Sequence, residues 1–92
     1  MFNKIEKIVK LTLGTTAQTV PVNGLCCLVQ NLSDSAGVYF KEKRIDGAAA
    51  TASNGWRLGP GEATAIPLTA LELSLVASAA STDVRVMILD LG

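Results

Sequence analysis

The chain has 92 residues, of which 49% are hydrophobic and 17% are charged, and its mean hydropathy is +0.38. Eight Lys and Arg side chains balance eight Asp and Glu side chains, so a nucleic-acid partner bound through phosphate neutralisation is not expected. This length fits one small domain, residues 1–92, with a thin core. Strands that are apolar on both faces therefore predict a partner surface, either further copies of the chain or a larger assembly.

The residue types also limit the chemistry. The sequence contains no histidine, which removes the usual general base, the usual zinc ligand and the Ser-His-Asp arrangement. Cys26 and Cys27 are adjacent, so in a strand they point to opposite faces, and we interpret them as small buried hydrophobes. We expect no enzyme, no cofactor and no metal site; the alternative is a pair of carboxylates of the glycosidase type. No secretory signal and no apolar run of about 18 residues is found, so we expect synthesis in the cytoplasm and no membrane contact.

The amino end combines two spacings. Apolar residues three apart, Phe2, Ile5 and Ile8, suit one face of a helix, whereas the alternation that follows suits a strand at about residues 7–13. We predict a short N-terminal arm, residues 1–8, that leads into this strand.

The next segments alternate between turns and strands. Pro21 cannot donate to a ladder, so residues 18–22 are predicted to form an edge strand or a connection. Asn23-Gly24 is a favoured two-residue turn between antiparallel strands. Residues 25–30 are apolar on both faces, which predicts a central strand.

A turn-rich segment then leads to residues 38–43, predicted as the return strand, with Val38 and Phe40 on the same face as Glu42. Residues 45–54 are small and polar without a period of two. They predict an exposed loop that is a candidate for mobility.

The stretch Gly55-Trp56-Arg57-Leu58-Gly59-Pro60-Gly61-Glu62 carries the clearest turn signal. Pro60 presets φ for the second position of a type II turn, and Gly61 accepts the positive φ of the third, so we predict the tip of a hairpin. Trp56 has two interpretations. It is either a core or subunit-interface residue, or a platform that stacks on a sugar ring beside Arg57.

The carboxyl-terminal third reads as strands at residues 63–68, 71–75 and 84–91. A helix at residues 69–73 is disfavoured because its leucines are spaced by two. Turn signals every eight to twelve residues predict an all-β fold, an antiparallel β-sandwich or small jelly roll of about seven to eight strands with a short N-terminal arm.

Several of these motifs resemble small β-sandwich virion proteins of tailed bacteriophages. The motifs are Val29-Gln30-Asn31 before a Ser/Asp/Gly turn, Val38-Tyr39-Phe40 after it, the alanine- and serine-rich loop, the Gly55–Glu62 stretch and the final strand. The resemblance covers residues 25–92. It implies a capsid cement or decoration protein, commonly a homotrimer, that lies in the virion over joints between subunits of the major capsid protein.

We expect contacts with these partners from apolar or aromatic groups outside any evident core, with one neighbouring cation: Phe2, Ile5, Ile8, Trp56 and Arg57. Deleting residues 1–8 is expected to leave the fold intact and to abolish association. The alternatives are a carbohydrate-binding jelly-roll module of the fibre or lectin type and a tail or head–tail connector component.

Overall fold

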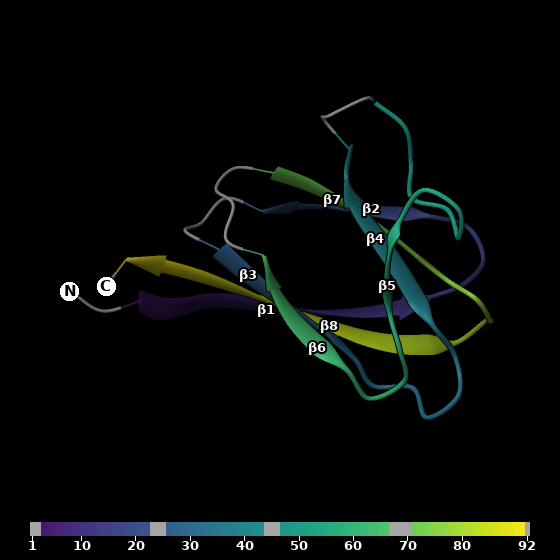
Figure 1. Ribbon diagram of the computed structural model, residues 1–92. Coiled ribbons are helices and arrows are strands. Elements are labelled where there is room, and N and C mark those ends of the chain that lie inside the picture. The colour runs from purple at the N-terminus through teal and green to yellow at the C-terminus, as the bar shows by residue number, and fades with distance from the viewer. Residues whose placement is uncertain (1–2, 23–25, 44–46, 67–70, 92) are drawn as a thin grey trace.

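The computed structural model describes residues 3–22, 26–43, 47–66 and 71–91, with the backbone alone at 3–7, 71 and 89–91. Eight strands follow one another in the chain: β1 (Asn3–Leu13), β2 (Gln18–Val22), β3 (Cys26–Asn31), β4 (Val38–Glu42), β5 (Trp56–Leu58), β6 (Ala63–Ile66), β7 (Leu71–Ala77) and β8 (Thr82–Leu91). They form two antiparallel sheets of four strands, which pack as the layers of a sandwich (Figure 1). The predicted all-β sandwich is therefore confirmed.

The strand order is that of a jelly roll. The first sheet has the order β1-β8-β3-β6 and the second the order β2-β7-β4-β5. The pairs are thus nested, β1 with β8, β2 with β7, β3 with β6 and β4 with β5, as in a long hairpin rolled onto itself. Only β4 and β5 are both consecutive in the chain and neighbours in a sheet. Every other connection crosses from one sheet to the other.

The core lies between the sheets and is built by alternate residues of each strand. Val84, Val86 and Ile88 of β8 face it, as their period of two predicts. Both position predictions for the early strands are also confirmed: β3 lies between β8 and β6, and β2 is an edge strand. The buried cluster is Leu13, Val20, Val22, Cys27, Val29, Val38, Phe40, Leu58, Leu73, Leu75, Ala77, Val84, Val86 and Ile88.

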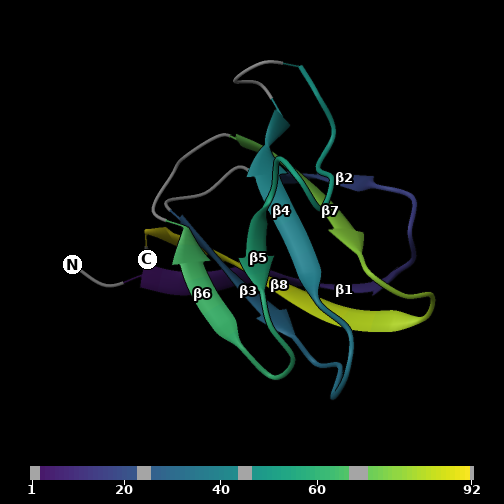
Figure 2. The ribbon, with the colours of Figure 1, turned by 45° about the vertical axis from the view of Figure 1, so that its right-hand side comes forward.

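The turn at Pro60-Gly61 forms as predicted, but it does not close a hairpin. Gly61 has φ +74°, and the amide of Glu62 donates to the carbonyl of Gly59 at 3.1 Å. However, β5 belongs to the second sheet and β6 to the first, so this turn carries the chain across the sandwich margin (Figure 2). Turn chemistry is local and does not encode which sheet receives the next strand.

Two other predicted pairings fail for the same reason. Asn23-Gly24 lies outside the described residues, but the strands on either side, β2 and β3, belong to different sheets and are not a hairpin. The segment predicted to return beside β3 is β4, which pairs with β7 and β5 instead.

The predicted arm is wrong over most of its length, because β1 begins at Asn3 rather than near residue 7. It pairs with β8 from Asn3 opposite Leu91 to Leu13 opposite Thr82, with a register shift between Ile5 and Lys7. This bulge explains the misleading spacing. Ile5 and Ile8 are three residues apart in β1, but they lie opposite Leu89 and Met87, which are two residues apart in β8. The extra residue of the bulge therefore gives the strand an apolar spacing of three, which resembles that of a helix.

Candidate functional site

The outer face of the first sheet carries a row of apolar residues that crosses all four strands. Ile8 lies opposite Met87, Met87 opposite Leu28, and Leu28 opposite Ala65. We call these four residues the apolar row. The Ile8 side chain is 50% exposed, those of Met87 and Leu28 are half-buried, and Ala65 is exposed. Apolar groups that cross a solvent-facing sheet in this way are typical of an interaction surface.

The next row of the same face is polar and positively charged. Lys10 lies opposite Arg85, and Arg85 lies opposite Gln30. Like charges directly opposite one another are unfavourable in an isolated sheet. The pair formed by Lys10 and Arg85 therefore favours an acidic neighbour next to the apolar row.

The structure separates the predicted contact residues into two groups. Phe2 lies outside the described residues, and only the backbone of Ile5 is described, opposite Leu89 in the ladder. Ile8 belongs to the apolar row. Trp56 and Arg57 lie far from it in the fold, on the edge strand β5 of the second sheet.

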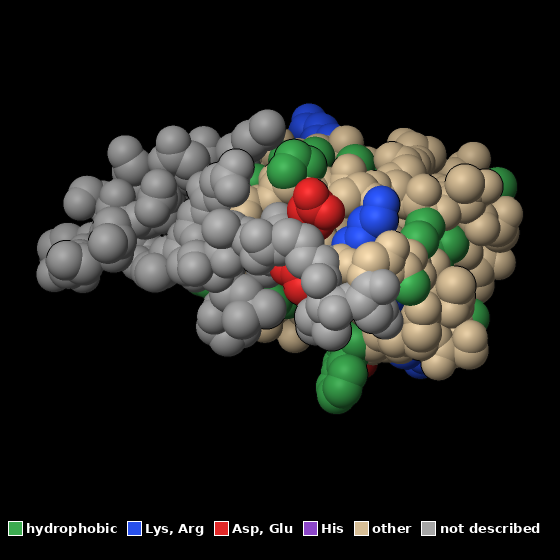
Figure 3. Space-filling view, turned by 90° about the horizontal axis from the view of Figure 1, so that it is seen from above, with side chains coloured by type: hydrophobic (Ala, Val, Ile, Leu, Met, Phe, Trp, Pro, Cys, Tyr) green, Lys and Arg blue, Asp and Glu red, His purple; other side chains and the backbone are tan. Residues whose placement is uncertain are grey.

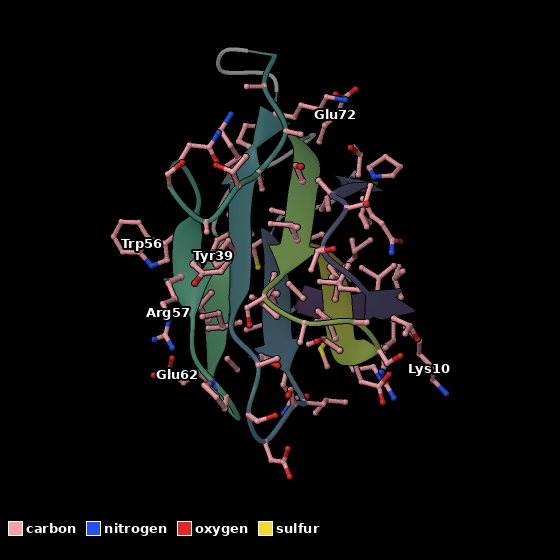
Figure 4. All side chains as sticks on the ribbon, turned by 90° about the vertical axis from the view of Figure 1, so that its right-hand side faces the viewer. Lys10, Tyr39, Trp56, Arg57, Glu62 and Glu72 are labelled. Carbon is pink, nitrogen blue, oxygen red and sulfur yellow. The ribbon has the colours of Figure 1, made fainter. Side chains whose placement is uncertain are left out.

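Trp56 is not a core residue of this chain. Its side chain is 73% exposed and projects away from the ribbon (Figure 4). Its partner across the ladder is Phe40, which is buried, whereas Arg57 lies opposite Tyr39. Because side chains alternate along a strand, the Trp56 side chain projects from the same face of β5 as Leu58, the face toward the interior. Trp56 nevertheless lies at the open margin of the sandwich, where its ring is exposed.

Arg57 lies on the outer side of β5, close to two other polar side chains. A Cβ placed on Gly37 would lie 3.5 Å from Nε of Arg57 and 3.8 Å from the hydroxyl of Tyr39, so these two groups meet above this glycine. Glu62, which follows the turn, accepts a hydrogen bond from the amide of Gly59 and lies on the same margin (Figure 4).

A pocket of about 570 Å³ lies on the outer side of the second sheet, beside this margin. Seen from the side of β7 and β2, hydrophobic side chains appear as small separate patches, and one hydrophobic group projects from the margin (Figure 3). The pocket has no charged lining residue, and five of its ten lining residues are alanines. The full lining is Thr15, Ala17, Tyr39, Ala49, Ala50, Thr51, Ala52, Val76, Ala77 and Ser78.

The loop predicted at residues 45–54 forms one wall of this pocket. Residues 47–49 and 51–54 are exposed, as expected, but Ala50 is buried and its amide donates to Oγ of Ser74 at 2.9 Å. Asn54 closes the loop, because its Oδ1 accepts from the amide of Thr51 and its Nδ2 donates to the carbonyl of Ala49. The loop is thus fastened over β7 by a buried hydrogen bond.

Asn31 is the structurally important polar residue that sequence reasoning missed. It is fully buried, and its Nδ2 lies within 3.2 Å of three carbonyl oxygens, those of Ala36, Leu58 and Gly59. Its Oδ1 accepts from the amide of Ser33 at 2.9 Å. The sequence contained an indication of this role. Asn31 follows Cys27 and Val29 at a spacing of two, so its side chain points toward the core, and a buried polar side chain needs hydrogen-bond partners within the protein.

The two cysteines are free thiols. Cys27 is fully buried and Cys26 half-buried, so their interpretation as buried hydrophobes is confirmed for Cys27 and only in part for Cys26. Burial, and to a smaller extent the neighbouring Cys26, raises the pKa of Cys27 from its ordinary value of 9.0 to about 11.

This shift predicts a loss of stability in alkali. The folded chain holds the Cys27 proton more tightly than the unfolded chain, so the stabilisation is complete below pH 9 and is lost as the pH rises through about 11. We expect the free energy of unfolding to fall by about 2–3 kcal/mol over this interval, relative to a Cys27→Ala chain that lacks this thiol. Urea unfolding of both chains from pH 8 to pH 11.5 measures it, and parallel curves would contradict the prediction.

In the part of the chain that the structure describes, no group of three or more His, Cys, Asp and Glu side chains could hold a metal ion. No helix among the described residues is long and apolar enough to cross a membrane. Comparison with protein-family models, with curated proteins and with solved structures finds no match.

Proposed function

We propose that the chain is a structural virion protein that binds the outside of a tailed-phage capsid as a cement or decoration protein. Its partners are the major capsid protein and further copies of itself, and the proposed role involves no catalysis, cofactor, nucleic acid or membrane. The observation that carries the proposal is the apolar row on the outer face of the first sheet.

The form of this surface suits a large and repetitive partner. Three strand spacings of about 4.8 Å make the row roughly 14 Å long. Such a patch contributes a modest free energy per copy, at about 25 cal/mol per Å² of apolar area removed from water, and the contribution is repeated over many copies on a particle. The adjacent Lys10 and Arg85 add charge selectivity for an acidic capsid surface.

Co-sedimentation with empty capsids, assembled from the major capsid protein of the same genome, tests this proposal. Ile8→Glu places a charge in the exposed end of the apolar row and is expected to weaken binding at least about tenfold, while the chain still folds because Ile8 is 50% exposed. Thr19→Glu is the matched control. It adds the same charge at an exposed position of β2, on the outer face of the other sheet, and is expected to bind normally.

Two results would contradict the proposal. Failure of the unaltered chain to sediment with the capsids would remove the decoration role. Equal binding by the Ile8→Glu and Thr19→Glu chains would remove the apolar row as the docking surface.

The exposure of Trp56 favours one second candidate, a carbohydrate-binding jelly-roll module. An indole ring beside an arginine can stack on a sugar ring and hydrogen-bond its hydroxyl groups. A glycan titration that changes the fluorescence of Trp56, the only tryptophan of the chain, would support this function in place of the first.

A further inference from the structure

The side chain most in need of a partner is Trp56. It is the most exposed of the large hydrophobic side chains that the structure describes, at 73% against 50% for Ile8 and 43% for Leu32. Large aromatic side chains bury roughly 150–250 Å² each when they dock, and tryptophan is the residue most enriched at the energetic centres of interfaces. A free indole on a three-residue edge strand therefore points to a contact outside the fold.

The pocket on the second sheet has the chemistry that an indole needs. Its floor includes Val76, which is 7% exposed, and its walls are mostly alanine, so they leave room for a flat ring. Tyr39 and Thr15 are among the lining residues and carry hydroxyl groups of the kind that can accept a hydrogen bond from the single N–H of an indole. The absence of charge in this lining disfavours an ionic ligand. The volume of about 570 Å³ falls within the range of roughly 300–1,000 Å³ of pockets that enclose a small ligand.

The Trp56 side chain does not line the pocket of its own copy. Trp56 shares the interior side of the ladder with its partner Phe40, whereas Tyr39 and its partner Val76 line the pocket from the outer side of the same sheet. The sheet itself separates the ring from the pocket. A second molecule can bring the two together without any rearrangement of the sheet.

We infer that Trp56 of one copy occupies the alanine-lined pocket of a second copy. The inference deepens the self-association part of the proposed function and uses a surface separate from the apolar row, which stays available to the capsid. If two copies each place Trp56 in the pocket of the other, they form a dimer with twofold symmetry. If each copy places Trp56 in the pocket of the next copy, the copies form a ring. In both arrangements each copy supplies one ring and one pocket.

The unaltered chain supplies a direct readout because it contains a single tryptophan. Raising the concentration from about 1 to about 200 μM is expected to increase the sedimentation mass and to shift Trp56 emission to shorter wavelength, as the ring leaves water. A chain that stays monomeric over this range, or that associates with unchanged emission, overturns the inference.

Two variants remove the two halves of the contact. Trp56→Ala removes the ring, and Ala52→Arg fills the pocket from an exposed loop position. Each is expected to weaken self-association at least about 30-fold, the loss typical of a central interface residue. Ser53→Arg is the matched control, because Ser53 is the next residue, is exposed and does not line the pocket, and it is expected to associate normally.

Mixing the two defective chains gives the sharpest result. One copy with an intact Trp56 and one with an intact pocket complete a single contact, so the mixture is expected to form one-to-one pairs although neither chain associates alone. Normal association of the Ala52→Arg chain, or no pairs in the mixture, places Trp56 elsewhere and overturns the inference. Capsid co-sedimentation of the Ala52→Arg chain separates the proposals, since its apolar row is intact whether or not the chain self-associates.

Discussion

Asn31→Asp is expected to lower the free energy of unfolding by about 3–5 kcal/mol, the largest effect of any single substitution considered for this chain. The change replaces the donating Nδ2 by an oxygen that faces the carbonyl oxygens of Ala36, Leu58 and Gly59 in a fully buried position. All three carbonyls lose the Nδ2 donor, although that of Gly59 keeps the amide of Glu62, and a charge is buried beside them. The melting temperature should fall by about 15–30 °C.

Gln30→Glu is the matched control, because it makes the same amide-to-carboxylate change at the neighbouring, exposed position. It is expected to alter stability by no more than about 0.5 kcal/mol. The deficit of the Asn31→Asp chain should also be larger at pH 7 than at pH 4, because a protonated carboxyl carries no charge and regains one donor. Urea denaturation at both pH values measures these effects. A loss of less than about 1 kcal/mol at pH 7 would show that the carbonyls find other donors.

Deleting residues 1–8 is expected to destabilise the fold by about 2–5 kcal/mol, in contrast to the expectation from the sequence that the fold survives intact. The deletion removes five residue pairs from the ladder, from Asn3 opposite Leu91 to Ile8 opposite Met87. A backbone hydrogen bond contributes a net 0.5–1.5 kcal/mol or so, and about one is lost per pair. The deletion also leaves the carboxyl-terminal half of β8 without its partner on this side.

Loss of capsid binding after this deletion would therefore not identify a contact arm. Ile8→Thr is the cleaner comparison, because it keeps the backbone ladder and the β-branched shape while it removes apolar surface from the apolar row. Thermal unfolding of the two chains separates the effects. If the chain without residues 1–8 has the same melting temperature as the unaltered chain, the interpretation of residues 1–8 as an arm outside the fold would be correct.

The two proposed surfaces lie on opposite layers of the sandwich. The apolar row belongs to the first sheet, and Trp56 and the pocket belong to the second. A chain of this size has little interior, so both layers leave apolar groups outside the core. In the proposed function, the second layer contacts further copies of the chain and the first layer contacts the capsid, so both sets of exposed apolar groups are covered.

The sequence by itself determined most of the strands and the faces of their residues, with the first half of β1 as the exception. The alternation of Val84, Val86 and Ile88 and the imino nitrogen of Pro21 act within one strand, so local pattern was sufficient for them. The turn at Pro60-Gly61 was equally local, because the φ preferences of two residues define it. The all-β class and the approximate number of strands followed from these elements.

Only the tertiary structure decided which strands pair, because the nested order of a jelly roll joins segments far apart in the chain. It turned the expected hairpin at Gly61 into a crossing between sheets, and the expected arm into a bulged strand beside β8. It also brought Ile8, Met87 and Leu28 into one row from three separate segments. The alternation of residues 27, 29 and 31 indicated that Asn31 points inward, but two of its three carbonyl partners, those of Leu58 and Gly59, lie 27 and 28 residues further along the chain. Only the folded chain brings them within hydrogen-bond distance of Nδ2.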